Sequence, residues 1–366
     1  VILASTGISA IKAKGKTIHS FFLFPPRILI DEKIKRLRSQ VIKKVDTILI
    51  DECSMIRCDV LDAIDKSLKL NRNTDKIFGG VQIILLGDVY QLPPVIRENE
   101  KEIFNNFYPM GHQFYHAKCY DQAQIKTYEL TKIYRQKDKV FIDILNKIRI
   151  GKIDNLDLLA LNIKVLNKNS KIPLETIILS PTNRKVDEIN NANLHSINSK
   201  AFSYLSTQTG DFKDKPADEI LELKIGAQVM LIKNDNKSPK RWVNGSIGIV
   251  TDLSNDSIHV KIKNNIYKIN KDTWEKFDYL IENEKVNHQV VATFTQYPIK
   301  LAWAVTIHKS QGQTFEKAII DLDTGSFAYG QTYVALSRVT SLEGLFLTRA
   351  IKTSDIKFED NLNFLS

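Results

Sequence analysis

Four short apolar runs in this chain each end abruptly at polar or glycine residues. They are VILASTG (1–7), TILIDE (47–52), VQIILLGD (81–88) and ETIILSPTN (175–183). Continuous β-branched runs of this length favour strands buried on both faces, as in a parallel sheet. Between two of them, segment 58–70 carries apolar residues at helical spacing, namely Val60, Leu61, Ile64 and Leu68. Alternating strands and helices predict a doubly wound α/β fold.

The polar residues that follow these runs predict where a ligand binds. In an open parallel sheet the carboxyl ends of the strands meet at one edge, and ligands bind along that edge. We therefore expect residues 5–7, 51–52, 87–88 and 180–182 to lie near a ligand.

The pattern changes after Gly226. Short strand-like segments separated by turn residues follow, at AQVMLIKN (227–234), GSIGIVTDL (245–253), SIHVKIKN (257–264) and NIYKIN (265–270). This pattern predicts a small β-barrel inserted into the second half of the chain. The α/β pattern returns with KAIIDL (317–322) and LEGLFLTRAI (342–351).

Charge and composition narrow the range of partners. The formal net charge of +10 favours a polyanion, either nucleic acid or an acidic membrane surface, although a basic surface kept for solubility explains it equally well. No apolar run approaches the roughly 18 residues of a membrane span. Three cysteines form no paired framework, which favours a reducing intracellular setting.

The segment TILIDECSM (47–55) places two carboxylates directly after a buried strand. In ATPases of the P-loop class, such a pair holds magnesium and aims a water. Asp51 would lie in the outer sphere of the ion, and Glu52 would polarise the attacking water. The alternative is an acidic helix start, where carboxylates complement the helix dipole.

The segment GDVYQLPPV (87–95) follows the next strand. Gly87 permits a tight turn, Asp88 can cap that turn, and the two prolines stiffen the exit, so Gln91 points at a γ-phosphate or its water from a rigid loop. A proline-stiffened loop without this function is the alternative. Two such loops on consecutive strands favour a site.

Two arginines follow apolar segments, Arg135 in LTKIYRQKD (130–138) and Arg338 in YVALSRVTSLEGL (333–345). An arginine brought to a transferring phosphoryl group stabilises its developing charge. A surface salt bridge of little energetic value is the alternative for each.

Further segments offer groups that bind phosphates or bases. TIHKSQGQTF (306–315) concentrates polar groups directly after the apolar run LAWAV, and NKSPKRW (236–242) combines three cations with a tryptophan. Phe21, Phe22 and Phe24 offer aromatic faces for bases, although we expect at least one of them in the core.

The ordered motifs resemble those of the petite integration frequency (PIF) family of superfamily 1 DNA helicases, kin to RecD-type helicases. They are ASTGISA (4–10), TIHSFF (17–22), ILIDECSM (48–55), GGVQIILLGDVYQLPPV (79–95), IYRQKD (133–138), IGAQVMLIKN (225–234) with VNGSIGIV (243–250), AVTIHKSQGQTF (304–315) and YVALSRVTSLEGL (333–345). The resemblance spans nearly the whole chain.

The resemblance implies two RecA-like doubly wound parallel-sheet domains with a small β-barrel insertion in the second. The first domain is expected at 1–122, with a wedge-like element at 21–44. The second is expected at 123–240 and 298–366, with the insertion at 241–297.

The resemblance also implies roles in ATP hydrolysis. Asp51 and Glu52 correspond to the Walker B pair, with Mg²⁺ held at Asp51, and Gln91 to the sensor of the γ-phosphate. Arg135 and Arg338 resemble arginine fingers. Gln311 and Gly312 are expected to line the ATP cleft.

For DNA, the resemblance implies that two sets of residues grip a single strand. The first set is Ser5, Thr6, Gly7, Thr17, His19, Ser20 and Phe21, and the second is His308, Lys309 and Ser310. The expected partners are single-stranded DNA and forked or structured DNA, with no membrane, and the expected state is a monomeric motor.

The function implied by the resemblance is an ATP-dependent DNA helicase or translocase that moves 5′ to 3′ on single-stranded DNA. It would act in repair, recombination, replication or telomere maintenance. The expected location is the cytoplasm or nucleoid for a prokaryotic or viral protein, and the nucleus or mitochondrion for a eukaryotic one. Two alternatives stay open: a nucleic-acid-binding module without ATPase activity, and a RecD-like subunit of a helicase–nuclease complex.

One element of the family pattern does not occur in the sequence. The 366 residues contain no segment of the form G-x-x-x-x-G-K-[ST], whose lysine and backbone amides cradle phosphates. In the family this loop precedes the strand that ends in ASTG, so we expect it within about 30 residues upstream of Val1, the length of one βαβ unit. The chain opens inside a predicted strand and without methionine, so we expect a fragment and not an ATP-inactive relative.

Overall fold

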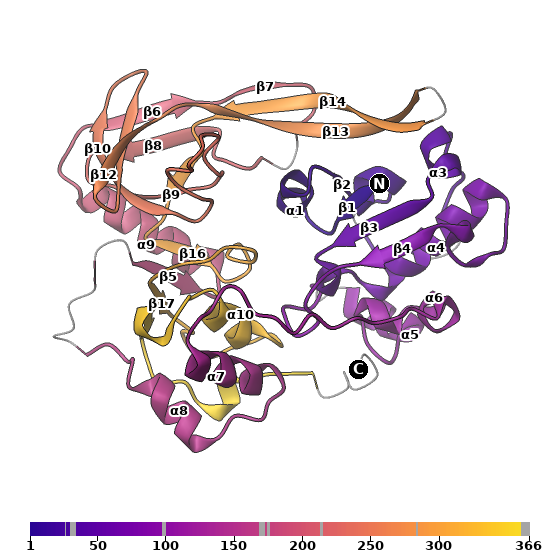
Figure 1. Cartoon of the computed structure of the whole chain (residues 1–366), viewed down its shortest axis with the longest axis horizontal. Coiled ribbons are helices and arrows are strands. Elements are labelled where there is room, and N and C mark those ends of the chain that lie inside the picture. The colour runs from indigo at the N-terminus through magenta and orange to yellow at the C-terminus, as the bar shows by residue number, and fades with distance from the viewer. Residues whose placement is uncertain are drawn as a thin grey trace. The chain divides into compact units, whose positions relative to one another are not determined.

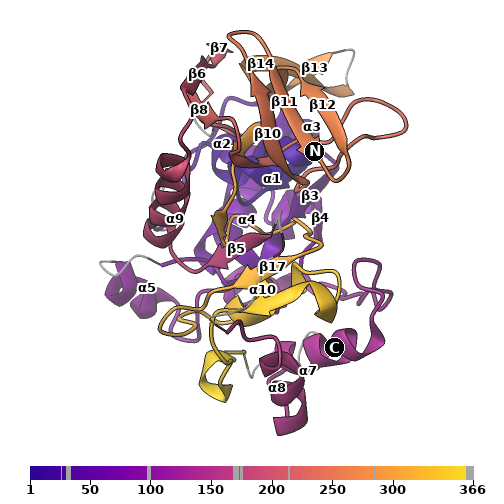
Figure 2. The same ribbon diagram turned by 90° about the vertical axis from the view of Figure 1, so that its left-hand side faces the viewer.

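The computed structural model describes residues 1–25, 27–29, 34–96, 100–167, 173, 176–212, 215–282 and 285–359. The chain forms two compact units, shown from two sides in Figures 1 and 2. Unit 1 comprises Val1–Glu129, Gln208–Asp214 and Trp274–Phe294, and unit 2 comprises Leu130–Thr207, Lys215–Thr273 and Thr295–Ser366. Across the described ranges, each helix is too short or too polar to cross a membrane.

Unit 1 is built on a parallel sheet. Its strands are β1 (Ile2–Ala4), β2 (Lys16–Thr17), β3 (Thr47–Asp51) and β4 (Gln82–Leu85), in the order β2-β1-β3-β4. The associated helices are α1 (Gly7–Lys12), α2 (Ile18–Phe22), α3 (Gln40–Lys44), α4 (Cys58–Arg72), α5 (Lys101–Phe107) and α6 (Lys118–Ala123), with short 3-10 turns η2 (Cys53–Met55), η3 (Ile77–Gly80) and η5 (Phe114–His116). Unit 1 thus has the predicted alternation of strands and helices around a parallel sheet.

Helix α4 has the apolar face that its sequence predicts, since Val60, Leu61, Ile64 and Leu68 are all buried. Its buried carboxylates bind loops around it. Asp62 accepts hydrogen bonds from the Tyr108 hydroxyl (2.9 Å) and the Cys119 amide (2.8 Å). Buried polar groups are costly unless hydrogen-bonded, so these contacts fix the loop that leads to α6.

Unit 2 repeats the parallel arrangement. Its sheet has the order β16-β5-β17-β18, formed by β5 (Ile177–Ser180), β16 (Ala304–Thr306), β17 (Ala318–Ile320) and β18 (Leu345–Leu347). Its helices are α7 (Lys139–Arg149), α8 (Asn155–Asn162), α9 (Asn183–Ser196) and α10 (Gln331–Ser337), with 3-10 turns η6 (Leu342–Gly344) and η7 (Thr353–Asp355). The predicted fold class, α/β with two parallel sheets, is confirmed.

An antiparallel region interrupts unit 2 in sequence. Its main sheet has the order β12-β11-β10-β9-β15, formed by β9 (Gln228–Leu231), β10 (Ile247–Leu253), β11 (Ile258–Ile262), β12 (Asn265–Ile269) and β15 (Ile299–Leu301). Strands β6 (Ala201–Leu205) and β8 (Ile220–Lys224) pair beside it, and residues of both, such as Tyr204 and Leu221, share its buried core.

The insertion expected at 241–297 needs correction at both ends. The antiparallel strands begin at β6 and end with β15, outside that range. Within it, β13 (Asp272–Glu282) and β14 (Lys285–Gln296) form a separate sheet with β7 (Thr207–Thr209), in the order β13-β14-β7, and belong mostly to unit 1. There Lys16 forms an ion pair with Asp278 at 2.6 Å. Alternating hydrophobicity identifies strands, but the partner of each strand depends on contacts distant in sequence.

Internal contacts involve part of each of two aromatic or basic segments. Phe21, Phe22 and Phe24 are 8%, 1% and 7% exposed, so their rings lie in the core. Residues 26 and 30–33 of the expected wedge, 21–44, lie outside the described residues. In 236–242, Arg241 forms an ion pair with Asp235 at 2.8 Å and stacks over buried Trp242. Hydrogen bonds from Arg241 hold the pKa of Asp235 well below its ordinary value.

Candidate functional site

The carboxyl edge of the first sheet brings together the polar residues that follow β1, β3 and β4. In the parallel register Ala4 lies opposite Asp51, and Ile50 lies opposite Leu85. The Ser5 hydroxyl donates to the carbonyl oxygen of Glu52 at 3.3 Å, which joins the first two turns. The predicted clustering at this edge is therefore present in unit 1.

Glu52 has a left-handed backbone, with φ 55° and ψ 50°. This conformation costs a non-glycine residue roughly 1–3 kcal/mol and is found at functional sites. The Glu52 amide donates to Oδ1 of Asp51 at 3.0 Å, which orients that carboxylate. The chain thus turns sharply where strand β3 ends and presents two neighbouring half-buried carboxylates.

Gly87 is required for close approach between the turns after β3 and β4. A Cβ atom at this position would lie 2.8 Å from Cys53 Sγ and 2.9 Å from the Cys53 nitrogen. The Cys53 amide donates to the Leu86 carbonyl at 2.9 Å, which holds the two turns together. Gly87 does not have the left-handed backbone for which a tight turn would require glycine. Glycine is needed here because a side chain would collide with Cys53.

Asp88 organises the next turn, as predicted. Its carboxylate accepts from the Tyr90 amide at 3.1 Å and from Nε2 of Gln91 at 3.1 Å, and its carbonyl accepts from the Gln91 amide at 3.0 Å. The Gln91 side chain is therefore oriented by Asp88, beside the turn that carries Asp51 and Glu52.

A pocket of about 300 Å³ opens beside this edge in unit 1. Its lining includes Ser5, His19, Arg27, Arg57, Pro94 and Glu100. Burial, and then the charge of Arg57, lower the pKa of His19, so its imidazole is neutral at pH 7. The pocket joins two residues from different predicted DNA-binding motifs, Ser5 and His19.

Other residues predicted to grip DNA in unit 1 have a local structural role. The Thr6 hydroxyl caps α1 by accepting from the Ser9 amide at 3.2 Å, and the Thr17 hydroxyl caps α2 by accepting from the Ser20 amide at 3.2 Å. Such caps stabilise a helix by roughly 1 kcal/mol. Gly7 is the first residue of α1. The predicted DNA contacts of these residues and of Phe21 remain predictions, and buried Phe21 presents no open face for a base.

In unit 2, Arg338 lies at the end of α10 and is 1% exposed. Its Nε donates to the Val334 carbonyl at 3.0 Å, and its Nη2 donates to Oγ of Ser337 at 2.8 Å. These contacts hold the guanidinium against the last turn of its own helix.

Arg135 reaches the same helix end from the segment before α7. Its side chain is exposed, and Nη1 donates to the Ser337 carbonyl at 3.4 Å, a long hydrogen bond. The Phe315 amide donates to the Arg338 carbonyl at 2.9 Å. Three predicted motifs, those containing Arg135, Phe315 and Arg338, therefore meet at the end of α10. Gln136, which sequence reasoning did not select, also lies there.

The segment 306–315 forms a tight turn after β16. The Lys309 amide donates to Oγ1 of Thr306 at 3.2 Å, and the Lys309 side chain is exposed. Burial lowers the pKa of His308, which favours the neutral imidazole, and its predicted phosphate contact stays a prediction. Gly312 has φ 68°, which favours glycine, and Gln311 is half-buried beside it.

Ser310 has a local structural role in this turn. It is 0% exposed, and its hydroxyl donates to the Ile307 carbonyl at 2.7 Å. Ser310 therefore shapes the turn, while Lys309 one residue earlier is presented to solvent. The predicted contact of Ser310 with a DNA phosphate stays a prediction.

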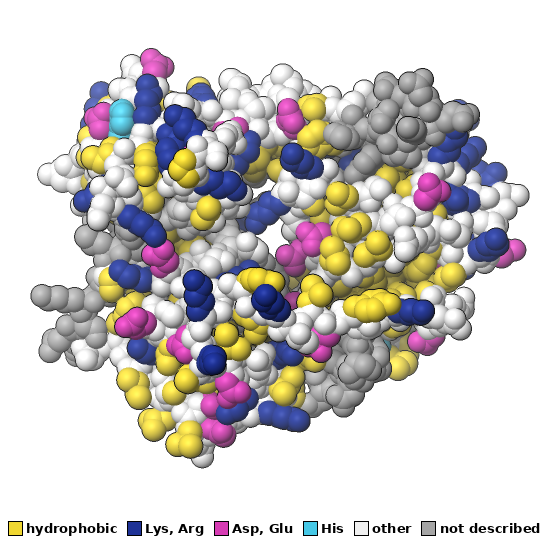
Figure 3. All heavy atoms as spheres, viewed as in Figure 1, with side chains coloured by type: hydrophobic (Ala, Val, Ile, Leu, Met, Phe, Trp, Pro, Cys, Tyr) yellow, Lys and Arg dark blue, Asp and Glu magenta, His cyan; other side chains and the backbone are white. Residues whose placement is uncertain are grey.

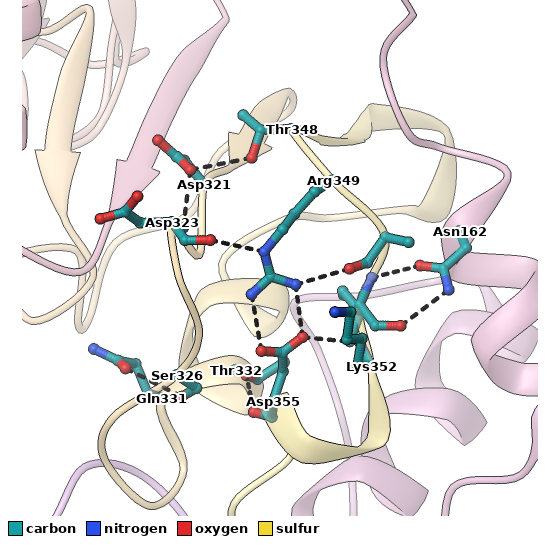
Figure 4. Close-up of polar contacts among 12 residues, drawn as sticks. Asn162, Asp321, Asp323, Ser326, Gln331, Thr332, Thr348, Arg349, Lys352 and Asp355 are labelled. Atoms are coloured by element: carbon teal, nitrogen blue, oxygen red, sulfur yellow. Dashed lines mark hydrogen bonds and ion pairs between the residues drawn. The ribbon is translucent and has the colours of Figure 1, made fainter.

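At the carboxyl edge of the second sheet, internal contacts hold the turns after β17 and β18 (Figure 4). The contacts described next do not involve the turn after β16. Arg349 donates to both oxygens of Asp355 at 2.8 Å and, through Nε, to the Asp323 carbonyl at 2.8 Å. Asp321 accepts from the Thr348 hydroxyl at 3.1 Å. These contacts join strands, turn and C-terminal segment.

Basic side chains are spread over the surface of both units (Figure 3), and several lie over the antiparallel sheet of unit 2. The exposed lysines of β11, β12 and their connection are Lys261, Lys263 and Lys268. This dispersed charge fits a polyanionic partner and a basic surface kept for solubility equally well.

Comparisons with known proteins agree on one family. A family model described as PIF1-like helicase matches residues 1–158, and one described as the 2B domain of DNA helicase Pif1 matches residues 214–253. The ATP-dependent DNA helicase Pif1 of Bdellovibrio bacteriovorus is 33% identical over 94% of this chain and 77% of its own length. The chain spans only 53% of the ATP-dependent DNA helicase PIF1 of Emericella nidulans, with 28% identity.

Solved structures give the same result. Pif1 from Bacteroides sp. in complex with ADP-AlF4 has a TM-score of 0.89 and 36% identity, covering 98% of this chain and 84% of that one. The Bacteroides Pif1 bound to ssDNA has a TM-score of 0.69, covering 99% and 85%.

Proposed function

Because this chain belongs to the PIF1-like family of ATP-dependent DNA helicases, we propose that it is the motor part of an enzyme that moves 5′ to 3′ along single-stranded DNA. The observation that carries the proposal is the carboxyl edge of the first sheet. There Asp51, Glu52 and Gln91 lie on neighbouring turns fixed by hydrogen bonds from Ser5 and to Asp88.

The residues at this edge fit the chemistry of ATP hydrolysis. Mg²⁺ binds oxygen ligands and keeps several waters beside substrate phosphates, and the oriented carboxylate of Asp51 would hold such an ion from its outer sphere. Mg²⁺ held there would neutralise charge on the phosphates. Glu52 would accept a proton from the attacking water, Gln91 would position that water, and Arg338 and Arg135 would stabilise the charge that develops on the transferring phosphoryl group.

We propose that a phosphate-binding loop of the form G-x-x-x-x-G-K-[ST] lies on a strand beside β4. Strand β4 is at the edge of its sheet, and Ile84 and Leu86 are 36% and 44% exposed. Strands of parallel sheets are apolar on both faces because helices cover both faces. Ile84 and Leu86 share one face of β4 and are exposed there, which supports a further element packed beside this strand.

The DNA contacts proposed for this chain combine neutral hydrogen bonds and charge. Ser5 and His19 offer hydrogen bonds from one pocket in unit 1. Lys309 offers a charge from an exposed turn in unit 2. Such groups bind the backbone of a single strand without reading its sequence. The relative bound to ssDNA supports this substrate class.

We propose that the motor works as a monomer on forked or structured DNA, in repair, recombination, replication or telomere maintenance. Its location would then be the nucleoid of a prokaryote or the nucleus or mitochondrion of a eukaryote. The relatives' names as DNA helicases support these roles.

Unwinding of tailed duplexes tests the proposal on the full-length protein. A duplex with only a 5′ single-stranded tail should be unwound when ATP is present, and a duplex with only a 3′ tail should remain paired, as should a blunt duplex. Single-stranded DNA should also increase the rate of ATP hydrolysis, because it favours the closed, active arrangement. Unwinding from the 3′ tail alone, or ATP hydrolysis unaffected by DNA, would refute the proposal.

A further inference from the structure

Gln136 is a buried glutamine whose side chain holds the backbone on both sides of Arg338. It is 6% exposed. Its Nε2 donates to the carbonyl of Ser337 at 2.9 Å and to the carbonyl of Val339 at 3.0 Å. Each amide proton therefore has an acceptor, one before and one after the arginine.

The Ser337 carbonyl is one that a helix leaves unsatisfied at its end, and the Val339 carbonyl lies just beyond that end. Helix α10 ends at Ser337, and the last four carbonyls of a helix have no partner within it. The intervening carbonyl, that of Arg338, accepts from the Phe315 amide at 2.9 Å. Three successive carbonyls are thus bound by groups from two other segments, and the peptide units that carry Arg338 are fixed.

A purely structural role is the simplest alternative, and the chain contains a matched example. Gln228 is also 6% exposed, and its Nε2 donates to the carbonyls of Thr176 and Ala302 at 2.9 and 2.8 Å. It joins β9 to the backbone near β5 and β16, where no residue has been assigned to the reaction. The two glutamines share burial and bonding, and they differ in which backbone they hold.

We propose that Gln136 is a positioning residue for phosphoryl transfer, acting through Arg338. The inference rests on the proposed function, in which Arg338 stabilises charge on the transferring phosphoryl group. A misplacement of a catalytic group by about 1 Å can cost on the order of a hundredfold in rate. Removal of both donors of Gln136 frees the Val339 carbonyl and leaves the Ser337 carbonyl with the long hydrogen bond from Arg135. The backbone that carries Arg338 can then shift, and the guanidinium shifts with it while its charge remains.

The test uses the full-length protein and Gln136→Met, which keeps the length of the side chain but cannot donate. DNA-stimulated ATP hydrolysis should show kcat lowered about 10- to 100-fold, while KM for ATP and the affinity for single-stranded DNA change less than about threefold. The matched control Gln228→Met should lower the melting temperature by a similar amount and leave kcat within about twofold of the parent.

A double-mutant cycle separates positioning from general destabilisation. In an Arg338→Ala background, Gln136→Met should cause no further loss of kcat, because it acts through the missing side chain, whereas independent effects would multiply. If Gln136→Met prevents folding, Gln136→Asn, which keeps the donors on a shorter side chain, is carried through the same cycle.

The outcomes distinguish the two proposals. If Arg338→Ala leaves kcat unchanged, the proposed role of Arg338 fails. If Arg338→Ala lowers kcat but Gln136→Met behaves like Gln228→Met, or multiplies with Arg338→Ala, the positioning role of Gln136 is wrong and the proposed function stands.

Discussion

The two parallel sheets have the same architecture, but their carboxyl edges differ in what their charged groups do. At the first edge, Asp51 ends β3 and Glu52 follows it; the Asp51 carboxylate accepts from the Glu52 amide, and the Glu52 backbone carbonyl accepts from the Ser5 hydroxyl. At the second edge, Arg349 and Asp355 bind each other through two hydrogen bonds of 2.8 Å. The same topology therefore provides an edge that can bind a ligand in one unit and an internal clamp in the other.

The difference limits the rule that ligands bind at the carboxyl ends of parallel strands. The rule identifies the first edge, where Glu52 keeps a left-handed backbone at a cost in stability. In unit 2 the arginine assigned to phosphoryl transfer, Arg338, lies at the end of a helix and not directly after a strand. Topology alone thus shows where a ligand can bind. The hydrogen bonds of the charged groups show which edge is held together by internal ion pairs.

Glu52→Gln gives the largest expected effect and tests the first edge. The amide is nearly isosteric but cannot accept the proton of the attacking water, so kcat for ATP hydrolysis should fall about 10²- to 10⁴-fold. ATP-dependent binding of single-stranded DNA should be largely retained, because Asp51 remains. Glu102→Gln, an exposed residue of α5, is the charge-matched control and should leave kcat unchanged. Near-normal turnover in Glu52→Gln would remove the contrast between the two edges.

Sequence reasoning succeeded where the information is local. The strand ends and the capping by Asp88 are encoded in short segments, and the motifs follow one another along the chain. The first edge could be predicted from these features. Thr6 and Thr17 were assigned to DNA, although a threonine before a helix also caps that helix. The N-cap signature could have revealed this second role.

The remainder depends on contacts between distant segments. Nothing in the turn 306–315 distinguishes buried Ser310 from exposed Lys309 before the turn is folded. The bonds of Gln136 to carbonyls about 200 residues later, and the sheet that β13 and β14 form with β7, likewise have no local signal. Buried polar residues are the class most easily missed, because their acceptors are backbone atoms.

Asp355→Asn tests whether the second edge is a structural clamp. Burial acts to raise the pKa of Asp355, but hydrogen bonds from Arg349 and the Lys352 amide outweigh it, and the pKa is lowered. A lowered pKa stabilises the fold above the unfolded value near 3.9, and this contribution is lost as pH falls through the folded value. At pH 7 the substitution should cost about 3 kcal/mol, and the difference from the parent should shrink below about pH 4.

Denaturant unfolding followed by tryptophan fluorescence measures this effect, since Trp242 and Trp303 both lie in unit 2. The control is Glu316→Gln, which removes an ion pair with Lys263 of 2.6 Å whose side chains are 72% and 69% exposed. That exposed pair should contribute less than about 1 kcal/mol. Equal losses for the two variants would mean that Asp355 is no more important than a surface charge.

Lys309→Ala gives the smallest expected effect. It tests the turn after β16, the outer strand of the second sheet, which is not part of the Arg349–Asp355 clamp. Lys309 is exposed while its backbone is fixed to Thr306. If this charge meets a DNA phosphate, its removal should weaken binding to all single-stranded sequences alike and make the slope of log K against log salt shallower by about one unit or slightly less. Lys317→Ala, an exposed lysine just beyond the turn, is the control and should leave the slope unchanged. A change in affinity that depends on base sequence, or an equal change in the control, would mean that this turn does not hold the DNA backbone. The whole second edge would then be structural, in contrast to the first edge.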